Sequence, residues 1–158
     1  MQGNPKVIAA LNEALKEELT AISQYFLHAE MCENWHYHKL GELIKKQSID
    51  EMKHAETLIE RILFLDGTPN MTELMHVNIG QTVKDQLESD LKLETAAVAM
   101  YNRSVATARE AGDNASRELF ERLLKDEEEH VDWLEAQLHQ IKEMGYERYL
   151  SQQIREEK

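Results

Sequence analysis

The sequence is poor in the residues that interrupt helices or cross-link chains, with two prolines, six glycines and one cysteine among its 158 residues. A lone cysteine, Cys32, excludes an intrachain disulfide and any zinc or iron–sulfur site built from several cysteines. No glycine or proline lies between Pro5 and Gly41, so the first stretch of the chain is free to form one long helix.

Basic residues and long apolar runs are also scarce. Eighteen lysines and arginines stand against 30 aspartates and glutamates, which gives a net charge of −12. This balance excludes nucleic acid as a partner, because phosphates need a basic surface, and it suits a protein that attracts cations. No run approaches the ~20 apolar residues needed to cross a bilayer, and residues 1–6 lack the apolar segment of a targeting signal. We therefore expect a cytoplasmic protein with no membrane partner.

The spacing of apolar residues predicts helices throughout, and the length fits a single domain spanning residues 1–158. Four long helices are expected: the first begins at Asn4 and Pro5 and ends at a break over 33–38, the second ends near Leu65, the third runs from about Gln81 to Ala111, and the fourth is capped by Ser116 and closed by Gly145. A short amphipathic piece over 146–154 needs neighbours in order to fold, such as other subunits.

Residues 66–81, between the second and third helices, form a long link, since ~2–8 residues usually join the helices of a bundle. A long crossover joins parallel neighbours and lets the second half of the chain repeat the first. The fold expected from the sequence is therefore all-α: a four-helix bundle with a long crossover and a short fifth C-terminal helix.

The most informative motif is Glu-x-x-His, which occurs at Glu51 and His54 and again at Glu127 and His130. Three residues apart on a helix, the carboxylate and the imidazole lie on one face, one turn apart. Each pair also follows another glutamate by 33 residues, so that two triplets repeat with an offset of 76: Glu18, Glu51 and His54, then Glu94, Glu127 and His130.

The glutamates lie within apolar stripes, where a lone buried carboxylate costs several kcal/mol unless it is paired. For Glu18 alone, exposure beside Glu17 is an equal alternative, but the matching acids and histidines favour burial. Tyr25 and Tyr101 each follow a glutamate by seven residues on the same stripe. They can donate phenolic hydrogen bonds to the carboxylates or be satisfied elsewhere in the core, and Tyr25 is counted with the candidate catalytic residues.

Four carboxylates carry the charge that balances two divalent cations, and with two histidines they form the known ligand set of di-iron and di-manganese bundles. We expect Glu51 and Glu127 to bridge the two metals. Glu18 and Glu94 would each cap one metal, and each histidine would give one nitrogen. Iron and manganese suit these ligands, with zinc as a competitor. Two ferrous ions held there can give two electrons to oxygen or peroxide.

Met52 points about 100° away from the neighbouring glutamate, toward a flank of the bundle that it shares with Ile49. Leu19, Ile22 and Phe26 form a second apolar flank on the first helix. An apolar outer surface implies a partner chain or a ligand. From periodicity alone, packing at a subunit interface is the favoured role of Met52.

The chain resembles the bacterioferritins, the haem-containing branch of the ferritins, from end to end. The resemblance is carried by Met1–Pro5, Gln24–His28, Ser48–Ala55, Leu58–Leu65 and Asp126–His130. It implies the ferritin-like fold and ferroxidase ligands at all six positions of the two triplets. It also implies a hollow homo-oligomeric shell of 24 subunits.

The same resemblance implies a b-type haem on the two-fold axis of each subunit pair, with Met52 of both subunits as axial ligands. This replaces interface packing as the expected role of Met52, since a two-fold axis supplies the same residue twice. Leu19, Ile22, Phe26 and Ile49 would line the haem. A small iron–sulfur ferredoxin that docks above the haem would be the reductant.

Two positions need separate comment. Some bacterioferritins place a histidine where this chain has Lys46, beside an inner-surface iron site shared with an aspartate, here Asp50. A protonated lysine cannot ligate iron, which argues against that site. Trp133 stands near His130, where some members use a tryptophan as an electron source, and core packing is an equal alternative.

The expected function is iron storage with ferroxidase activity: Fe(II) is oxidised by oxygen or peroxide, stored as ferric mineral, and released with electrons from the haem. Whether the di-iron centre acts as a pore or as a stable cofactor stays open. One alternative is a non-storing di-iron peroxidase of the rubrerythrin type, although those carry an extra Cys-x-x-Cys domain. Another is a haem electron-transfer protein whose di-iron site is idle.

Overall fold

The computed structural model describes residues 1–154, which form helices and no strand. The helices are α1 (Pro5–Asn34), α2 (His38–Phe64), α3 (Val83–Glu110), α4 (Asn114–Met144) and α5 (Tyr146–Ser151). The predicted all-α bundle, with its long crossover and short fifth C-terminal helix, is confirmed.

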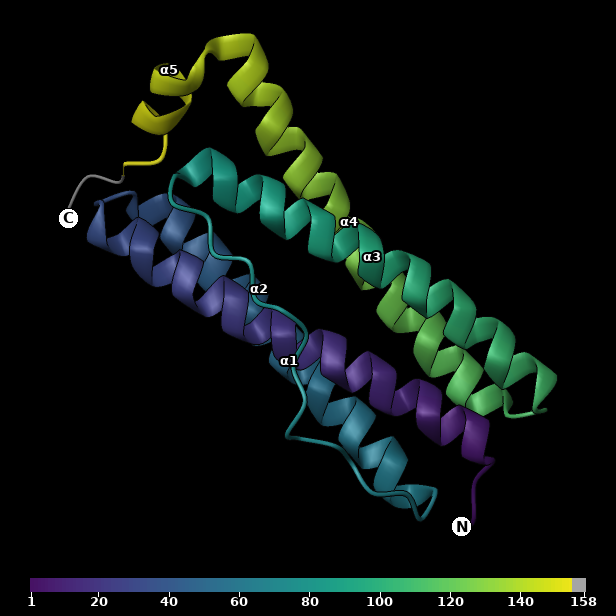
Figure 1. Cartoon of the computed structure of the whole chain (residues 1–158). Coiled ribbons are helices and arrows are strands. Elements are labelled where there is room, and N and C mark those ends of the chain that lie inside the picture. Colours follow the sequence, from purple (N-terminus) through teal and green to yellow (C-terminus); the bar gives the residue numbers. More distant parts are fainter. Residues whose placement is uncertain (155–158) are drawn as a thin grey trace.

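The four long helices form two pairs, α1 with α2 and α3 with α4, that pack side by side (Figure 1). A short turn joins the helices of each pair, so that the two helices run in opposite directions. The crossover after α2 travels back along the bundle before α3 begins, and α3 therefore runs parallel to α2. This arrangement brings the midpoints of all four helices to one level.

The helix starts follow ordinary capping chemistry, with one difference from the sequence prediction. The Asn4 side chain accepts the backbone N–H of Lys6 at 2.8 Å ahead of α1. Ser116 was predicted to cap α4, but this is wrong. The carboxylate of Asp113 accepts the Ser116 N–H at 3.0 Å, so that α4 begins at Asn114. Aspartate one turn earlier makes the same bond with a full negative charge at the helix N-terminus.

The crossover has no regular secondary structure, and its backbone is held by polar side chains of α1. Four of its N–H groups donate to them: Asn70 to Asn12 (2.8 Å), Met75 to Thr20 (2.9 Å), Asn78 to Gln24 (3.1 Å) and Gly80 to His28 (3.0 Å). These bonds replace the ladder that a helix or strand would supply. They fix the path of the crossover along α1.

The core consists of two apolar clusters, one toward each end of the bundle. One contains Leu11, Leu15, Leu58, Ile62, Met100, Tyr101, Phe120 and Leu123 among others. The second contains Tyr25, Leu40, Ile44, Leu87, Leu134, Ile141 and Tyr149 among others. On each long helix, the candidate metal ligands lie between residues of the first cluster and residues of the second. The packing of both clusters therefore positions the centre.

The short helix α5 packs on its own chain at the end of the bundle. Tyr149 is fully buried, and its hydroxyl donates to Oε1 of Gln137 at 2.7 Å. The carbonyl of Gln153, just beyond α5, accepts the N–H of Lys39 at 3.0 Å. The neighbours that this segment needs in order to fold are thus supplied, at this end, by α2 and α4 of the same chain.

Candidate metal centre

Each of the four long helices places one glutamate in the interior of the bundle. Glu18, Glu51 and Glu94 are 1% exposed, and Glu127 is fully buried. The alternative in which Glu18 reaches solvent is therefore wrong. Since a carboxylate cannot be buried cheaply without partners, the surroundings of these four groups decide what the site can do.

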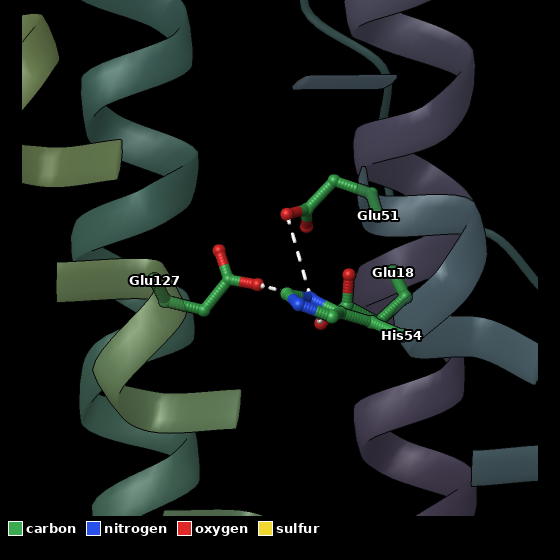
Figure 2. A group of neighbouring side chains, drawn as sticks. All are labelled: Glu18, Glu51, His54 and Glu127. Atoms are coloured by element: carbon green, nitrogen blue, oxygen red, sulfur yellow. Dashed lines mark hydrogen bonds and ion pairs between the residues drawn. The ribbon is translucent and has the colours of Figure 1, made fainter. Parts of the chain in front are cut away.

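The first group of potential ligand atoms comes from α1, α2 and α4. It consists of Glu18, Glu51, His54 and Glu127, whose ligand atoms all lie within 4.8 Å of one another. Figure 2 shows these side chains pointing toward one another from their helices. His54 Nδ1 lies 2.9 Å from Glu127 Oε1, 3.4 Å from Glu18 Oε1 and 3.6 Å from Glu51 Oε1.

The second group repeats the first with the roles of the halves exchanged. Glu51, Glu94, Glu127 and His130 also place their ligand atoms within 4.8 Å of one another. His130 Nδ1 lies 3.1 Å from Glu51 Oε1, 3.4 Å from Glu94 Oε1 and 3.5 Å from Glu127 Oε2. Glu51 and Glu127 belong to both groups, which is the arrangement expected of bridging carboxylates.

Several of these buried atoms make no hydrogen bond of acceptable geometry within residues 1–154, although Glu51 Oε1 and His130 Nδ1 lie 3.1 Å apart. The atoms without such a bond are Oε2 of Glu18, Glu94 and Glu127, Oε1 of Glu51, and Nδ1 of His130. Buried polar atoms are normally satisfied, so a set of them converging on one point needs an explanation. Their chemistry, carboxylate oxygen and imidazole nitrogen, fits divalent iron or manganese.

The two tyrosines contact the glutamates across the bundle. Tyr101 donates its hydroxyl proton to Oε1 of Glu18 at 2.5 Å, and Tyr25 donates to Oε1 of Glu94 in a short hydrogen bond. Each tyrosine therefore donates to the glutamate of the opposite helix, α1 or α3, and not to the glutamate seven residues before it on its own helix. Both rings are fully buried, so that these bonds fix the position of the capping carboxylates.

Burial and mutual repulsion change the protonation of the carboxylates. Burial and the charge of Glu127 raise the pKa of Glu18, and burial with the neighbouring carboxylates raises the pKa values of Glu51 and Glu94 well above their ordinary value. Burial also acts to raise the pKa of Glu127, but its contacts with Glu94 and the two histidines outweigh burial and hold that pKa well below its usual range.

The histidines respond in the opposite sense. Burial acts to lower their pKa values, but carboxylate contacts outweigh it. Contacts with Glu127 and Glu18 raise the pKa of His54 to about 11, and contacts with Glu127 and Glu94 raise the pKa of His130 to about 10. Without a metal, protons on these rings balance part of the negative charge, and divalent cations can replace those protons.

Both histidines also line a cavity of about 290 Å³. Its lining comes from equivalent positions of α2 and α4: Asp50, Lys53 and His54, and Asp126, Glu129 and His130. His54 Nε2 lies 3.0 Å from Asp126 Oδ2, whereas His130 Nε2 lies 4.0 Å from Asp50 Oδ2. Lys46, one turn before Asp50, is exposed.

The residues predicted to line a haem lie on the outer face of α1 and α2. Met52 and Phe26 are each 54% exposed, Ile49 is 42% exposed, and Leu19 and Ile22 are partly buried. The hydroxyl of Ser48, one turn before Met52, donates to the carbonyl of Ile22 at 3.0 Å, which brings the two flanks together. These side chains form one apolar surface on the α1–α2 pair.

Two other residues pack within the bundle. Trp133 is partly buried and packs against the second apolar cluster. Cys32 is fully buried, and burial together with the charges of Asp90 and Glu33 raises the pKa of its thiol to about 12. The thiol is therefore neutral at physiological pH.

The sequence is similar over most of its length to known proteins. Residues 8–144 match the profile of the family described as "Ferritin: Ferritin-like domain". This chain belongs to the ferritin family. Its relatives within that family include a bacterioferritin from Mycolicibacterium paratuberculosis, 45% identical over 152 residues, which are 96% of each chain.

Other relatives in the ferritin family carry the same name. A bacterioferritin from Streptomyces coelicolor is 46% identical over 151 residues, covering 96% of this chain and 90% of that protein. The solved structure of Mycobacterium tuberculosis bacterioferritin, BfrA, superposes with a TM-score of 0.97 at 43% identity over 98% of both chains. Along residues 1–154, none of the helices is both long and apolar enough to span a membrane.

One contact at the site was missed by the sequence analysis. Asp126 was not among the predicted site residues, yet it contacts His54. The available signal was the offset itself, because Asp50 and Asp126 are also 76 residues apart. Each stands one residue before a glutamate of the Glu-x-x-His motif, and the repeat of the triplets therefore extends to these aspartates.

Proposed function

We propose that this ferritin-family protein stores iron and oxidises Fe(II) to Fe(III) at the centre between its four long helices. The observation that supports this most is the pair of overlapping ligand groups that share Glu51 and Glu127. A shared pair of carboxylates suits two cations held close together rather than a single ion. Storage is proposed from the names of the relatives.

The charge of the centre supports the same reading. Four ionised glutamates carry four negative charges, which two divalent cations balance when both histidines are neutral. Glu18 and His54 would complete the ligands of one ion, and Glu94 and His130 those of the other. Two ferrous ions bound there supply two electrons to oxygen or peroxide. Tyr101 and Tyr25 hold the outer carboxylates in place through their hydroxyl protons.

Replacing one capping ligand tests the oxidation. We expect Glu18→Ala to slow Fe(II) oxidation at least about ten-fold, because one ion loses its ligand from α1. Oxygen consumption and the ultraviolet absorbance of Fe(III) measure the rate. Glu30→Ala, an exposed glutamate of the same helix, serves as the matched control and keeps the normal rate. An unchanged rate in Glu18→Ala would favour a protein whose di-iron site is idle.

A storage protein and a peroxidase differ in how much iron they retain after the reaction. A storage protein retains many ferric ions per chain in the assembled particle after oxidation. A peroxidase of the rubrerythrin type consumes hydrogen peroxide with a fixed complement of iron. Metal analysis of the isolated particle after successive additions of Fe(II) separates the two, and a constant iron content would contradict storage.

We further propose that the apolar surface around Met52 binds a b-type haem between two subunits. A surface with Phe26, Ile49 and Met52 each more than 40% exposed calls for a partner, and a two-fold axis would place two Met52 thioethers on opposite sides of one group. Thioether ligation favours the ferrous state of a haem iron. The 24-subunit shell of the family is part of the same proposal.

The haem proposal predicts a specific spectral loss. The native particle should show a Soret band, and Met52→Ala should lose the spectrum of methionine-ligated haem while Fe(II) oxidation at the separate buried centre continues. Leu63→Ala, an exposed apolar residue later in α2, is the matched control and keeps the band. Absence of a Soret band from the unmodified protein after haem addition and removal of the unbound haem would contradict the proposal.

A further inference from the structure

The carboxylate of Asp126 lies on the far side of His54 from the metal centre. Nδ1 of this ring points at Glu18, Glu51 and Glu127, and Nε2 points at Asp126 Oδ2 at 3.0 Å. The two nitrogens of His54 thus face two different sets of oxygens. Asp126 comes from α4 and His54 from α2, so that this contact also crosses the bundle.

A histidine can bind a metal through Nδ1 only when that nitrogen carries no proton. The proton of the neutral ring then stands on Nε2, where it needs an acceptor. A carboxylate at Nε2 selects this tautomer, fixes the ring orientation and makes the ligating nitrogen more basic. The Asp126 oxygen has the position and the distance for this role.

We propose that Asp126 is a positioning residue that holds His54 as a metal ligand, whereas Asp50 does not do the same for His130. This inference rests on the proposed di-metal centre. Asp126 does not touch the centre itself and acts through the imidazole.

The repeat of the chain supplies an internal comparison. Asp50 stands in α2 where Asp126 stands in α4, and it faces Nε2 of His130 in the same way. The separation there is 4.0 Å, which is too long for a hydrogen bond. The ligand sets of the two ions are equivalent in sequence. However, Nε2 of His54 is hydrogen-bonded to a carboxylate, and Nε2 of His130 is not.

Binding of Co(II), used here as a probe in place of Fe(II), tests the inference without relying on oxidation activity. The metal-free particle is titrated with Co(II), and the visible d–d bands report the number, affinity and coordination of the bound ions. The unmodified protein should bind two equivalents per chain. Asp126→Ala should weaken one equivalent by about 10–100-fold and leave the other unchanged.

Three further variants separate positioning from a general effect. Asp126→Asn keeps an acceptor oxygen for the Nε2 proton and should restore most of the lost affinity. Asp50→Ala should have a smaller effect than Asp126→Ala, because its carboxylate is not hydrogen-bonded to His130. Asp132→Ala removes an exposed carboxylate from the same helix and should bind both equivalents normally. Circular dichroism and particle size show that each variant is folded and assembled.

The outcomes distinguish this inference from the proposed function. If the unmodified protein binds fewer than two equivalents, the di-metal centre fails and the role of Asp126 fails with it. If the unmodified protein binds two and Asp126→Ala also binds two with equal affinity and spectrum, the inference alone is overturned. It is overturned as well if Asp132→Ala or Asp50→Ala weakens binding as much as Asp126→Ala does.

Discussion

At the scale of single residues, the centre is costly to the fold. Four carboxylates lie in the interior of the bundle, and burial and repulsion raise the pKa values of three of them. Glu127 is the exception, because its contacts with Glu94 and both histidines hold its pKa well below its ordinary value. Replacing such groups by apolar residues of similar volume often stabilises a protein. Their presence together is therefore best explained by the ions that we propose they bind.

Spacing in the sequence predicted which side chains would converge at the centre, but not which of them would form hydrogen bonds with one another. The offset of 76 placed six side chains at one level, and the structure brings all six together. The exchange of tyrosines, with Tyr25 on Glu94 and Tyr101 on Glu18, was not predicted. Periodicity fixes the face of a residue on its own helix, whereas the partner across the bundle depends on how far the helices are shifted along each other.

At the scale of elements, the start of α4 is held by a small ionic network. The Asp113 carboxylate accepts the Ser116 N–H at 3.0 Å and the Ser116 hydroxyl at 2.6 Å. Arg61 from the end of α2 donates to Asp113 at 2.9 Å and to the Ser116 hydroxyl at 2.9 Å. Because these three residues belong to different halves of the chain, the network ties α4 to α2 as well as capping it.

Asp113→Ala should lower the free energy of unfolding by about 1 kcal/mol at neutral pH, the usual cost of losing an N-cap. Burial acts to raise the pKa of Asp113, but its bonds with Ser116 and the charge of Arg61 outweigh burial and lower it. A lowered pKa means that the stabilisation is complete above about pH 4, the unfolded value, and is lost as pH falls through the folded pKa. The difference between the unmodified protein and Asp113→Ala should therefore shrink in acid.

Thermal unfolding at several pH values measures this difference. Asp113→Asn keeps a capping oxygen and loses only the charge, so its stability should fall between the other two. Glu118→Ala, an exposed residue of the same helix, controls for the general effect of removing an acid near the N-terminus. A difference that stayed constant from neutral to acid pH would show that the ionised carboxylate of Asp113 is not the stabilising group.

The path of the crossover over α1 could not be predicted from the sequence. The length and the parallel connection of the crossover were expected from the sequence. Segments without a repeating pattern carry no signal of the surface they follow. In the structure, that path is set by Asn12, Thr20, Gln24 and His28, polar side chains on one side of α1 that accept its N–H groups. Within the crossover, Gly80 permits a close approach to the start of α3, since a Cβ there would lie 2.3 Å from the Gln86 backbone nitrogen.

At the scale of the whole molecule, two similar halves surround the centre unequally. On one side, the ring of Tyr101 packs 6.3 Å from the ring of Phe120 within the first apolar cluster. On the other side, Tyr25 lies in the second apolar cluster, and His28 of α1 and Asp90 of α3 are buried with their Nδ1 and Oδ1 atoms 2.9 Å apart. A structure built on a repeat thus gives its two proposed ions different surroundings, which agrees with the unequal contacts of the two histidines.

Because the centre joins all four long helices, metal binding should stabilise the whole four-helix bundle. An ion present at a thousand times its dissociation constant adds about 4 kcal/mol per site, which raises the unfolding temperature of a chain of this size by about 8–16 °C.

Glu51→Gln removes a ligand shared by both groups and a carboxyl repelled by its neighbours. We expect this variant to be at least as stable as the unmodified protein without metal, yet to gain far less from Co(II). Calorimetric scans with and without Co(II), with the exposed Glu60→Gln of the same helix as control, measure both effects. A variant that is less stable without metal but keeps the full gain would show that Glu51 serves the fold and not the ions.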